Sequence, residues 1–269
     1  MKAGVSTASL FLRKNNEEAL PVLNDLGVNV AEVFLTSFSE YEAAFASLLA
    51  SVKGDLSINS VHVLNNQIEP QLFSAHERVL KDSFDLLDKV LTAAKLLGAP
   101  YYTFHGMARS KKAARNPDND NLDKMGNALR NISEFCKDRG VTLCLENVEW
   151  STYNRVGVFA EMKKRVPILK GVLDIKQARI SGYPYELYLD EMGENLAYAH
   201  ISDVQENGKM CLPGKGVFDF ETLVKRLQDV GFDGALLIEA YKDNYGEISE
   251  LKASCDFLNE ILYKLGALS

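Results

Sequence analysis

Residues 141–174 read VTLCLENVEWSTYNRVGVFAEMKKRVPILKGVLD. An apolar, β-branched run at Val141–Asn147 is followed by an amphipathic helical pattern at Gly157–Arg165 and a second apolar run at Gly171–Lys176. Two buried strands separated by one helix are typical of a βαβ unit with parallel strands. The segment therefore predicts one repeat of an α/β fold, and each of its two strands carries an acidic residue near its end.

The same alternation extends along the whole chain. The expected strands are Ala3–Ala8, Asn29–Leu35, Ser57–Leu64, Tyr101–Gly106, Val141–Asn147, Gly171–Lys176, Leu196–Asp203 and Ala235–Tyr241. The expected helices are Glu17–Leu26, Tyr41–Ser51, Ala75–Leu97, Leu122–Arg139, Gly157–Arg165, Tyr185–Glu191, Phe220–Val230 and Ile248–Leu265. Eight strand–helix pairs predict an α/β fold of a single (β/α)₈ TIM barrel, whereas a doubly wound sheet would have fewer strands and leave a second domain. We expect one domain over residues 1–269, because no linker or composition shift divides the chain.

Composition and charge narrow the classes of function. The 269 residues fit one barrel, and 30 basic against 37 acidic residues give a net charge of −7. This charge disfavours nucleic-acid binding, which draws most of its affinity from contacts to phosphate. No run reaches the ~18 consecutive apolar residues of a membrane helix. The four cysteines have neither zinc nor redox spacing and indicate thiols in a reducing compartment. We therefore expect a cytoplasmic protein with no nucleic-acid or membrane partner.

Ionisable residues stand at the ends of four consecutive expected strands. They are Glu146, Asp174, His200 and Glu239, and each follows apolar neighbours. Because side chains alternate along a strand, the aliphatic neighbours face the helices and these four point into the barrel mouth. Active sites of TIM barrels form at this end. Three carboxylates buried together need a compensating charge, and with one histidine they suit Mn²⁺, Co²⁺, Mg²⁺, Fe²⁺ or Zn²⁺. The sequence therefore predicts a site for one divalent metal ion.

Two further histidines lie on the neighbouring third and fourth expected strands. They are His62 and His105, and both are close to Glu146 in the order of the barrel. Two interpretations are open. The histidines could hold a second metal ion together with Glu146, or they could bind hydroxyl groups of a substrate, which is the interpretation that we favour.

Five other residues are candidate substrate contacts. Glu32 is expected to point into the barrel, mainly as a structural hydrogen-bonding group. Trp150 follows the fifth expected strand, where a sugar-stacking platform and a packed loop anchor are equally good interpretations. Gln177 and Arg179 follow the sixth strand, and Lys215 lies in a glycine-flanked loop after the seventh. For Arg179 and Lys215 a solvated position is the plainer interpretation, and contact with an anion is the alternative.

The longest connection runs from Met107 to about Asn121, after the fourth expected strand, and is rich in basic residues. A solvated surface loop is the plainer interpretation. An active-site flap or anion-binding loop is the alternative, because loops after barrel strands lie on the catalytic face.

Taken in order, these motifs resemble the xylose-isomerase-like (β/α)₈ superfamily of sugar and sugar-phosphate isomerases and epimerases, which includes the endonuclease IV branch. The resemblance covers essentially the whole chain. It rests on Glu32-Val33-Phe34, Leu97-Gly98-Ala99, His105-Gly106, Leu145-Glu146-Asn147, Gly171-Val172-Leu173-Asp174, His200-Ile201-Ser202-Asp203, Pro213–Asp219 and Gly231–Gly234 leading to Ile238-Glu239. It implies that Glu146, Asp174, His200 and Glu239 hold a single divalent ion.

The resemblance also implies a reaction. In sugar epimerases of this type two glutamates, here Glu146 and Glu239, face opposite sides of a bound ketose. One removes the proton beside the carbonyl and the other returns it, through a metal-stabilised enediolate. The implied partner is a small carbohydrate, either a sugar, a sugar phosphate or a polyol-derived ketone, and a homo-oligomer is an open alternative to a monomer.

Several positions depart from the closest patterns of that superfamily. Gln177, Thr152 and Glu206 stand where ketose 3-epimerases carry histidine, glutamate and arginine, which argues against a free-ketose 3-epimerase. The third zinc site of endonuclease IV relatives also lacks its ligands, at Gln177 and in Leu212–Gly216. Two alternatives stay open. One is a binuclear metal-dependent hydrolase or lyase with a second ion at the two histidines and Glu146, and the other is a non-catalytic sugar-binding barrel.

Overall fold

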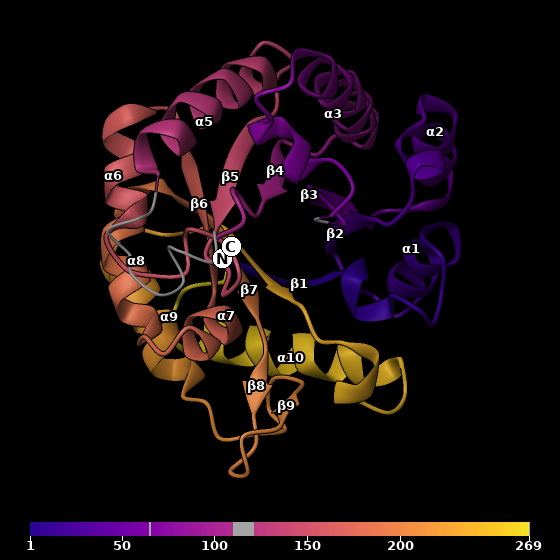
Figure 1. The fold of residues 1–269 in the computed structure, drawn as a ribbon. Helices are drawn as coiled ribbons and strands as arrows, with labels where there is room; N and C mark the ends of the chain where they lie inside the picture. Colours follow the sequence, from indigo (N-terminus) through magenta and orange to yellow (C-terminus); the bar gives the residue numbers. More distant parts are fainter. Residues whose placement is uncertain (65, 110–120, 269) are drawn as a thin grey trace.

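Eight parallel strands close into a barrel in the computed structural model, which describes residues 1–64, 66–109 and 121–268. The strands follow one another around the barrel in chain order, except for a small hairpin formed by β8 and β9 (Figure 1). The barrel strands are β1 (Lys2–Ser6), β2 (Val30–Leu35), β3 (Ser57–Val63), β4 (Tyr101–Phe104), β5 (Thr142–Glu146), β6 (Lys170–Asp174), β7 (Leu196–Ile201) and β10 (Ala235–Ile238). Each expected strand range overlaps one of them, so the (β/α)₈ TIM barrel is confirmed.

Helices surround the barrel, and each expected helical range overlaps one (Figure 1). They are α1 (Asn16–Asp25), α2 (Ala43–Val52), α3 (Glu77–Leu97), α5 (Leu122–Lys137), α6 (Val158–Arg165), α8 (Tyr185–Met192), α9 (Phe220–Asp229) and α10 (Ser249–Lys264). The helix boundaries have local causes. The Asp219 carboxylate accepts the Thr222 N–H and begins α9, and α3 ends at Gly98, whose φ of 73° suits glycine. In the described part of the chain, every helix is too short or too polar to cross a membrane.

Short elements at the ends of the strands were not predicted. The helix α7 (Ile175–Ile180) begins directly at Asp174, whose carboxylate accepts the Gln177 N–H, so the sixth strand ends two residues before the expected Lys176. The antiparallel hairpin of β8 (Asp203–Val204) and β9 (Met210–Cys211) follows β7. Single 3₁₀ turns are η1 (Thr7–Leu10), η2 (Phe38–Tyr41), η3 (Glu69–Phe73), η5 (Gly193–Asn195) and η6 (Lys242–Asn244). The basic connection predicted as a loop or flap falls largely on residues 110–120, outside the described residues.

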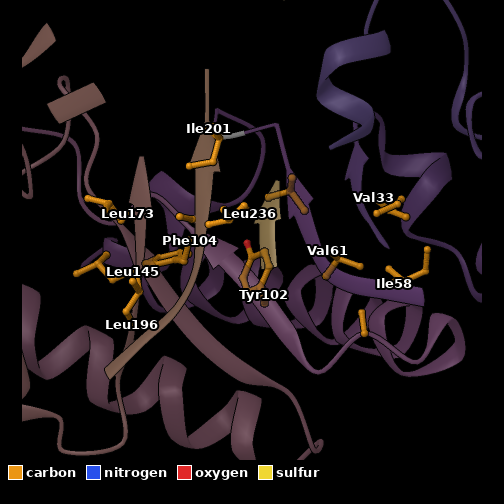
Figure 2. Close-up of a cluster of buried hydrophobic side chains, with 14 of the residues drawn as sticks. Val33, Ile58, Val61, Tyr102, Phe104, Leu145, Leu173, Leu196, Ile201 and Leu236 are labelled. Carbon is orange, nitrogen blue, oxygen red and sulfur yellow. The ribbon is translucent and has the colours of Figure 1, made fainter. Parts of the chain in front are cut away.

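Apolar side chains form two layers that position the barrel mouth. The outer layer lies between strands and helices and includes Leu145 and Leu173 (Figure 2). The inner layer fills the barrel and includes Cys144, Val172 and Leu237. Since alternate residues of a strand face opposite sides, the residues two positions after these inner ones also face inward, at the carboxyl ends of their strands. This alternation places three acidic side chains in the mouth.

A buried carboxylate organises the loop after β7. Asp203 accepts the backbone N–H groups of Val204, Gly214, Gly216 and Phe218 at 2.7–3.0 Å. A Cβ atom on Gly216 would lie 2.3 Å from the Val204 carbonyl oxygen and 2.4 Å from Asp203 Oδ1. Because both neighbours are rigidly held, the loop requires glycine at this position.

Gly216→Ala is therefore expected to lower the free energy of unfolding by about 1–3 kcal/mol, as overpacking usually does. Urea denaturation followed by circular dichroism measures it. The neighbouring Val217→Ala is the control, because Val217 is exposed and its truncation should stay within about 0.5 kcal/mol of the parent. Equal stabilities for the two variants would show that the loop accommodates the added methyl group.

Candidate metal centre and adjoining pocket

Four ionisable side chains from four neighbouring strands meet in the barrel mouth. Glu146 ends β5, Asp174 ends β6, His200 lies in β7 and Glu239 follows β10. All four are buried, and one ligand atom of each lies within 4.8 Å of the others. His200 Nδ1 is 2.7 Å from Glu146 Oε1 and 2.8 Å from Glu239 Oε2. Ligand atoms about 2.0–2.2 Å from one ion are themselves about 3 Å apart, so this spacing fits a single divalent ion.

The hydrogen bonds of this group test that fit. Among the described residues, Glu239 Oε2 accepts no hydrogen bond, although it lies 2.8 Å from His200 Nδ1, which is paired with Glu146 Oε1. On the other side of the ring, His200 Nε2 lies 3.1 Å from Glu32 Oε1. In a neutral ring that donates Nε2–H to Glu32, the Nδ1 lone pair would face Glu146 and Glu239, and a bound cation would take the place of the second ring proton. The donor set therefore fits a divalent metal ion.

The charges of the site influence one another strongly. Burial alone would lower the pKa of His200, but the carboxylates of Glu32, Glu239 and Glu146 hold it well above its usual range. Burial raises the pKa of Asp174 to about 6, although a nearby lysine opposes the shift. Such mutual perturbation is typical of functional sites, because desolvated like charges stay together only when counter-charges are present.

Glu32 lies beneath the metal-ligand set and does not line the pocket above it. Its carboxylate accepts hydrogen bonds from Ser6 Oγ at 2.9 Å, Ser60 Oγ at 2.7 Å and Thr103 Oγ1 at 2.6 Å. These contacts and the one to His200 agree with the structural hydrogen-bonding role expected from the sequence. They hold Glu32 in place behind His200. A carboxylate in this position fixes the tautomer of a metal-binding histidine.

His62 and His105 come together on the other side of Glu146. Their Nε2 atoms are 2.8 Å apart, and His105 Nε2 is 3.7 Å from Glu146 Oε2. His105 Nδ1 lies 2.8 Å from Glu69 Oε2, and Glu69 raises the pKa of His105 to about 9 against the effect of burial. The three side chains form a second buried group with the spacing of metal ligands. Both interpretations of the histidines, as ligands of a second ion or as partners of substrate hydroxyls, remain compatible with these contacts.

A cavity of about 190 Å³ opens beside these groups. Its walls include Phe34, Trp150 and Tyr241, with Gln177 at the edge. The Trp150 ring is half-buried, and its centroid lies 5.5 Å from that of His105. Gln177 Oε1 accepts the backbone N–H of Glu149 at 3.2 Å, which holds this lining side chain in place. A small cavity with apolar walls and a few converging polar groups is typical of a site for a small molecule.

Two of the predicted contacts lie outside this pocket. Arg179 is exposed on α7 and lines a different cavity. The cause is the helix that starts at Asp174, which carries Arg179 away from the barrel mouth. Lys215 is exposed in the loop that Asp203 organises and does not reach the metal-ligand set. Its glycine neighbours serve the turn of that loop instead of forming an anion site at the mouth.

Two charged residues of the site were missed in the sequence. Lys176 is buried, with Nζ 3.6 Å from Asp174 Oδ2 and 4.0 Å from Glu239 Oε1. Burial would lower the pKa of Lys176, but Asp174 and Glu239 raise it above its usual range, so the residue adds a positive charge. Glu69 lies in η3, outside any strand end, and no periodic pattern marks it. The signal for Lys176 was its place two residues after an acidic strand end.

Comparisons with known proteins agree with this geometry. Residues 20–261 match the family described as Xylose isomerase-like TIM barrel. The uncharacterised protein MJ1188 of Methanocaldococcus jannaschii is 23% identical over 252 residues, which cover 89% of this chain and 88% of the relative. A D-tagatose 3-epimerase-like protein superposes with a TM-score of 0.80 at 19% identity and covers 99% of this chain and 98% of its own. D-Psicose 3-epimerase from Clostridium cellulolyticum H10 has a TM-score of 0.77 at 16% identity, covering 97% of this chain and 99% of its own. The two structural similarities concern the fold.

Glu32→Gln is expected to weaken binding of Mn²⁺ about 10–100-fold, because the amide holds the His200 tautomer less firmly than the carboxylate. Calorimetric titration of protein freed of metal by chelation measures the affinity. Glu40→Gln is the matched control, since Glu40 also accepts several hydrogen bonds but lies outside the metal-ligand set. Equal affinities for parent and Glu32→Gln would exclude this role for Glu32.

Proposed function

The chain belongs to the xylose isomerase-like TIM barrel family, as its sequence resemblance predicted, and on that premise we propose a divalent-metal-dependent isomerase or epimerase. Its substrate class is a small sugar, a sugar phosphate or a polyol-derived ketone. The observation that carries the proposal is the buried set of Glu146, Asp174, His200 and Glu239, whose ligand atoms converge beside a small pocket.

The chemistry needs groups that this site contains. A C–H bond beside a carbonyl is a weak acid, so its proton leaves only when a base is in reach and the developing negative charge is stabilised. An ion held by Glu146, Asp174, His200 and Glu239 would supply that electrostatic stabilisation. Proton transfer and substrate binding are carried out by side chains of the protein.

Glu146 and Glu239 are the proposed proton-transfer residues. Their strands β5 and β10 are separated around the barrel by β6 and β7, so the two carboxylates reach the pocket from different sides. One removes the proton beside the carbonyl, and the other returns a proton to the reacting carbons. Burial alone would raise the pKa of Glu239, but Lys176 and His200 lower it below its usual range, which keeps the carboxylate ionised.

The other pocket residues bind and orient the substrate. His62 and His105 line the pocket, and Glu69 holds the His105 ring, so that the two Nε2 atoms, which are hydrogen-bonded to each other, can exchange this bond for bonds to substrate hydroxyl groups. Trp150 and Tyr241 supply ring faces that pack on the apolar side of a sugar and exclude water from the reacting carbons. The Gln177 amide adds one further donor at the rim.

Glu239→Gln is expected to abolish exchange of the substrate proton with deuterated water, with a loss of at least about 10²-fold as for other general bases. Nuclear magnetic resonance of a panel of ketoses and their phosphates, with and without Mn²⁺, measures the exchange. Glu134→Gln, on the exposed face of α5, is the control and should exchange normally. Normal exchange by a folded, metal-loaded Glu239→Gln would contradict the assigned role. Binding of sugars without exchange or turnover in the parent protein would instead favour a non-catalytic sugar-binding barrel.

A second candidate function is binuclear hydrolysis, dehydration or lyase chemistry, favoured by the buried group of His62, His105 and Glu146. Metal analysis of the purified protein distinguishes the two candidate functions. We expect one ion per chain for the parent and for His105→Gln, with a raised KM in the variant because a hydroxyl contact is lost. Two ions in the parent and one in His105→Gln would support the binuclear function.

A further inference from the structure

A second cavity, of about 320 Å³, adjoins the pocket above the metal ligands, called the first pocket below. It lies between η1, the start of α1 and the end of β2, on the same face of the barrel. Phe11 and Phe34 line both cavities. The first pocket, at about 190 Å³, is smaller than the roughly 300–1,000 Å³ of most ligand sites, whereas the two cavities together fall within that range. The proposed function uses only the first.

Aromatic rings connect the first pocket to the second cavity. The centre of the Phe34 ring lies 5.0 Å from that of His62 and 5.7 Å from that of Phe11. Phe34 stands two residues after Glu32 in β2, so its side chain faces the barrel mouth. A molecule that extends from His62 along these two rings enters the second cavity. Aromatic rings suit the apolar side of a sugar, and they favour such a path.

Hydrogen bonds between separate elements hold the floor of the second cavity. Thr7 Oγ1 donates to Asn16 Oδ1 at 2.7 Å and accepts the Phe34 N–H at 2.8 Å. Asn16 Nδ2 donates to the Phe34 carbonyl oxygen at 2.8 Å and to Glu40 Oε2 at 3.2 Å. Glu40 also accepts the Thr36 N–H at 2.6 Å. Because Thr7 and Asn16 are buried, the cavity keeps its shape without a ligand.

A strained turn brings Lys14 to the wall of the cavity. Leu12 has a φ of 64° and is 70% exposed, so a bulky apolar residue stands in a conformation that favours glycine. The Arg13 guanidinium anchors this turn, since it donates to the carbonyl oxygens of Tyr245 at 2.8 Å and Gly246 at 2.6 Å. Backbone strain of this kind is concentrated at binding and catalytic sites. The turn is therefore a second indication of a binding site.

The charged groups of the cavity wall balance one another. Arg13 and Lys14 are basic, and Glu18 and Glu40 are acidic. The Lys14 ammonium makes no hydrogen bond or ion pair with the described residues, so its donors are open to a ligand. Hydroxyl groups both donate and accept, and a neutral polyhydroxylated unit can use Lys14 and the two carboxylates together. A phosphate would instead be repelled by Glu18 and Glu40.

From these contacts we propose that the second cavity binds the neutral sugar unit of a glycosylated ketose. The ketose occupies the first pocket, with its carbonyl end beside Glu146 and Glu239 and its far end at Phe34. Lys14 donates to hydroxyl groups of the attached sugar, and the acidic groups of the wall accept from them. The inference rests on the proposed isomerase or epimerase function for the placement of the ketose, and it narrows the substrate class to sugars of two units.

Calorimetric titration of the Mn²⁺-loaded protein with D-fructose, isomaltulose and D-fructose 6-phosphate tests the site. Isomaltulose is D-fructose with a glucosyl unit on O6, at the end farthest from the carbonyl group. We expect isomaltulose to bind at least about tenfold more tightly than fructose, because the second unit adds hydrogen bonds to charged groups. Lys14→Gln should lower the ratio of these two affinities about tenfold. Lys225→Gln, exposed on α9 and outside both cavities, is the matched control and should keep the ratio of the parent.

Equal affinities of the parent for isomaltulose and fructose would overturn the inference, as would equal ratios for Lys14→Gln and Lys225→Gln. Tighter binding of fructose 6-phosphate than of isomaltulose would assign the cavity to an anion and overturn it too. Exchange of the substrate proton with deuterated water, measured on the same sugars, tests the proposed function separately. Isomaltulose that binds as expected without exchange supports the second cavity and contradicts the isomerase or epimerase function. Lys14 has no partner among the described residues, so Lys14→Gln is expected to fold, and circular dichroism checks this.

Discussion

The charge balance of the barrel mouth depends on the contacts between His200 and the carboxylates on the two sides of its ring. Glu32 holds one ring nitrogen from below, while Glu146 and Glu239 face the other from the pocket side. Burying this many acidic groups in one place is costly, because like charges in a poorly polarisable interior repel one another. The arrangement is stable only with positive charge among the carboxylates, which protonated rings and Lys176 supply and which the proposed metal ion would supply. Much of what the mouth can do chemically follows from this requirement.

The layers of side chains below the mouth hold these buried charged groups in fixed positions. Leu237 and Val172 belong to the apolar filling of the barrel. Beside it, Tyr198 and Thr103 share a hydrogen bond, and Thr103 also donates to Glu32. Hydrogen bonds through Tyr198, Thr103 and Glu32 thus link the apolar interior of the barrel to the candidate metal ligands. A ligand carboxylate with a fixed partner behind it keeps its orientation, which is a condition for both metal binding and proton transfer.

Lys176 supplies a buried positive charge at the barrel mouth. Its ammonium nitrogen lies 3.6 Å from Asp174 Oδ2, 4.0 Å from Glu239 Oε1 and 4.6 Å from the centre of the Tyr241 ring. The residue is held there because α7 starts immediately at Asp174, without an intervening loop. The start of α7 therefore fixes the positions of Asp174, of the buried Lys176 and of the exposed Arg179. Such dependence of several side chains on one local boundary is common where loops of a barrel carry the function.

The sequence by itself determined the barrel and four residues of its mouth. Alternation along a strand and the repeat of strand and helix are local properties, so eight repeats and the inward direction of Glu146, Asp174, His200 and Glu239 could be predicted from spacing alone. Only the tertiary structure decided which partners stand behind these residues. Glu69 reaches His105 from a 3₁₀ turn. Lys215 is exposed and does not line the pocket, and its loop is shaped by Asp203 through contacts to backbone more than ten residues away. Such contacts depend on how separate repeats pack, and no periodic pattern within one repeat encodes them.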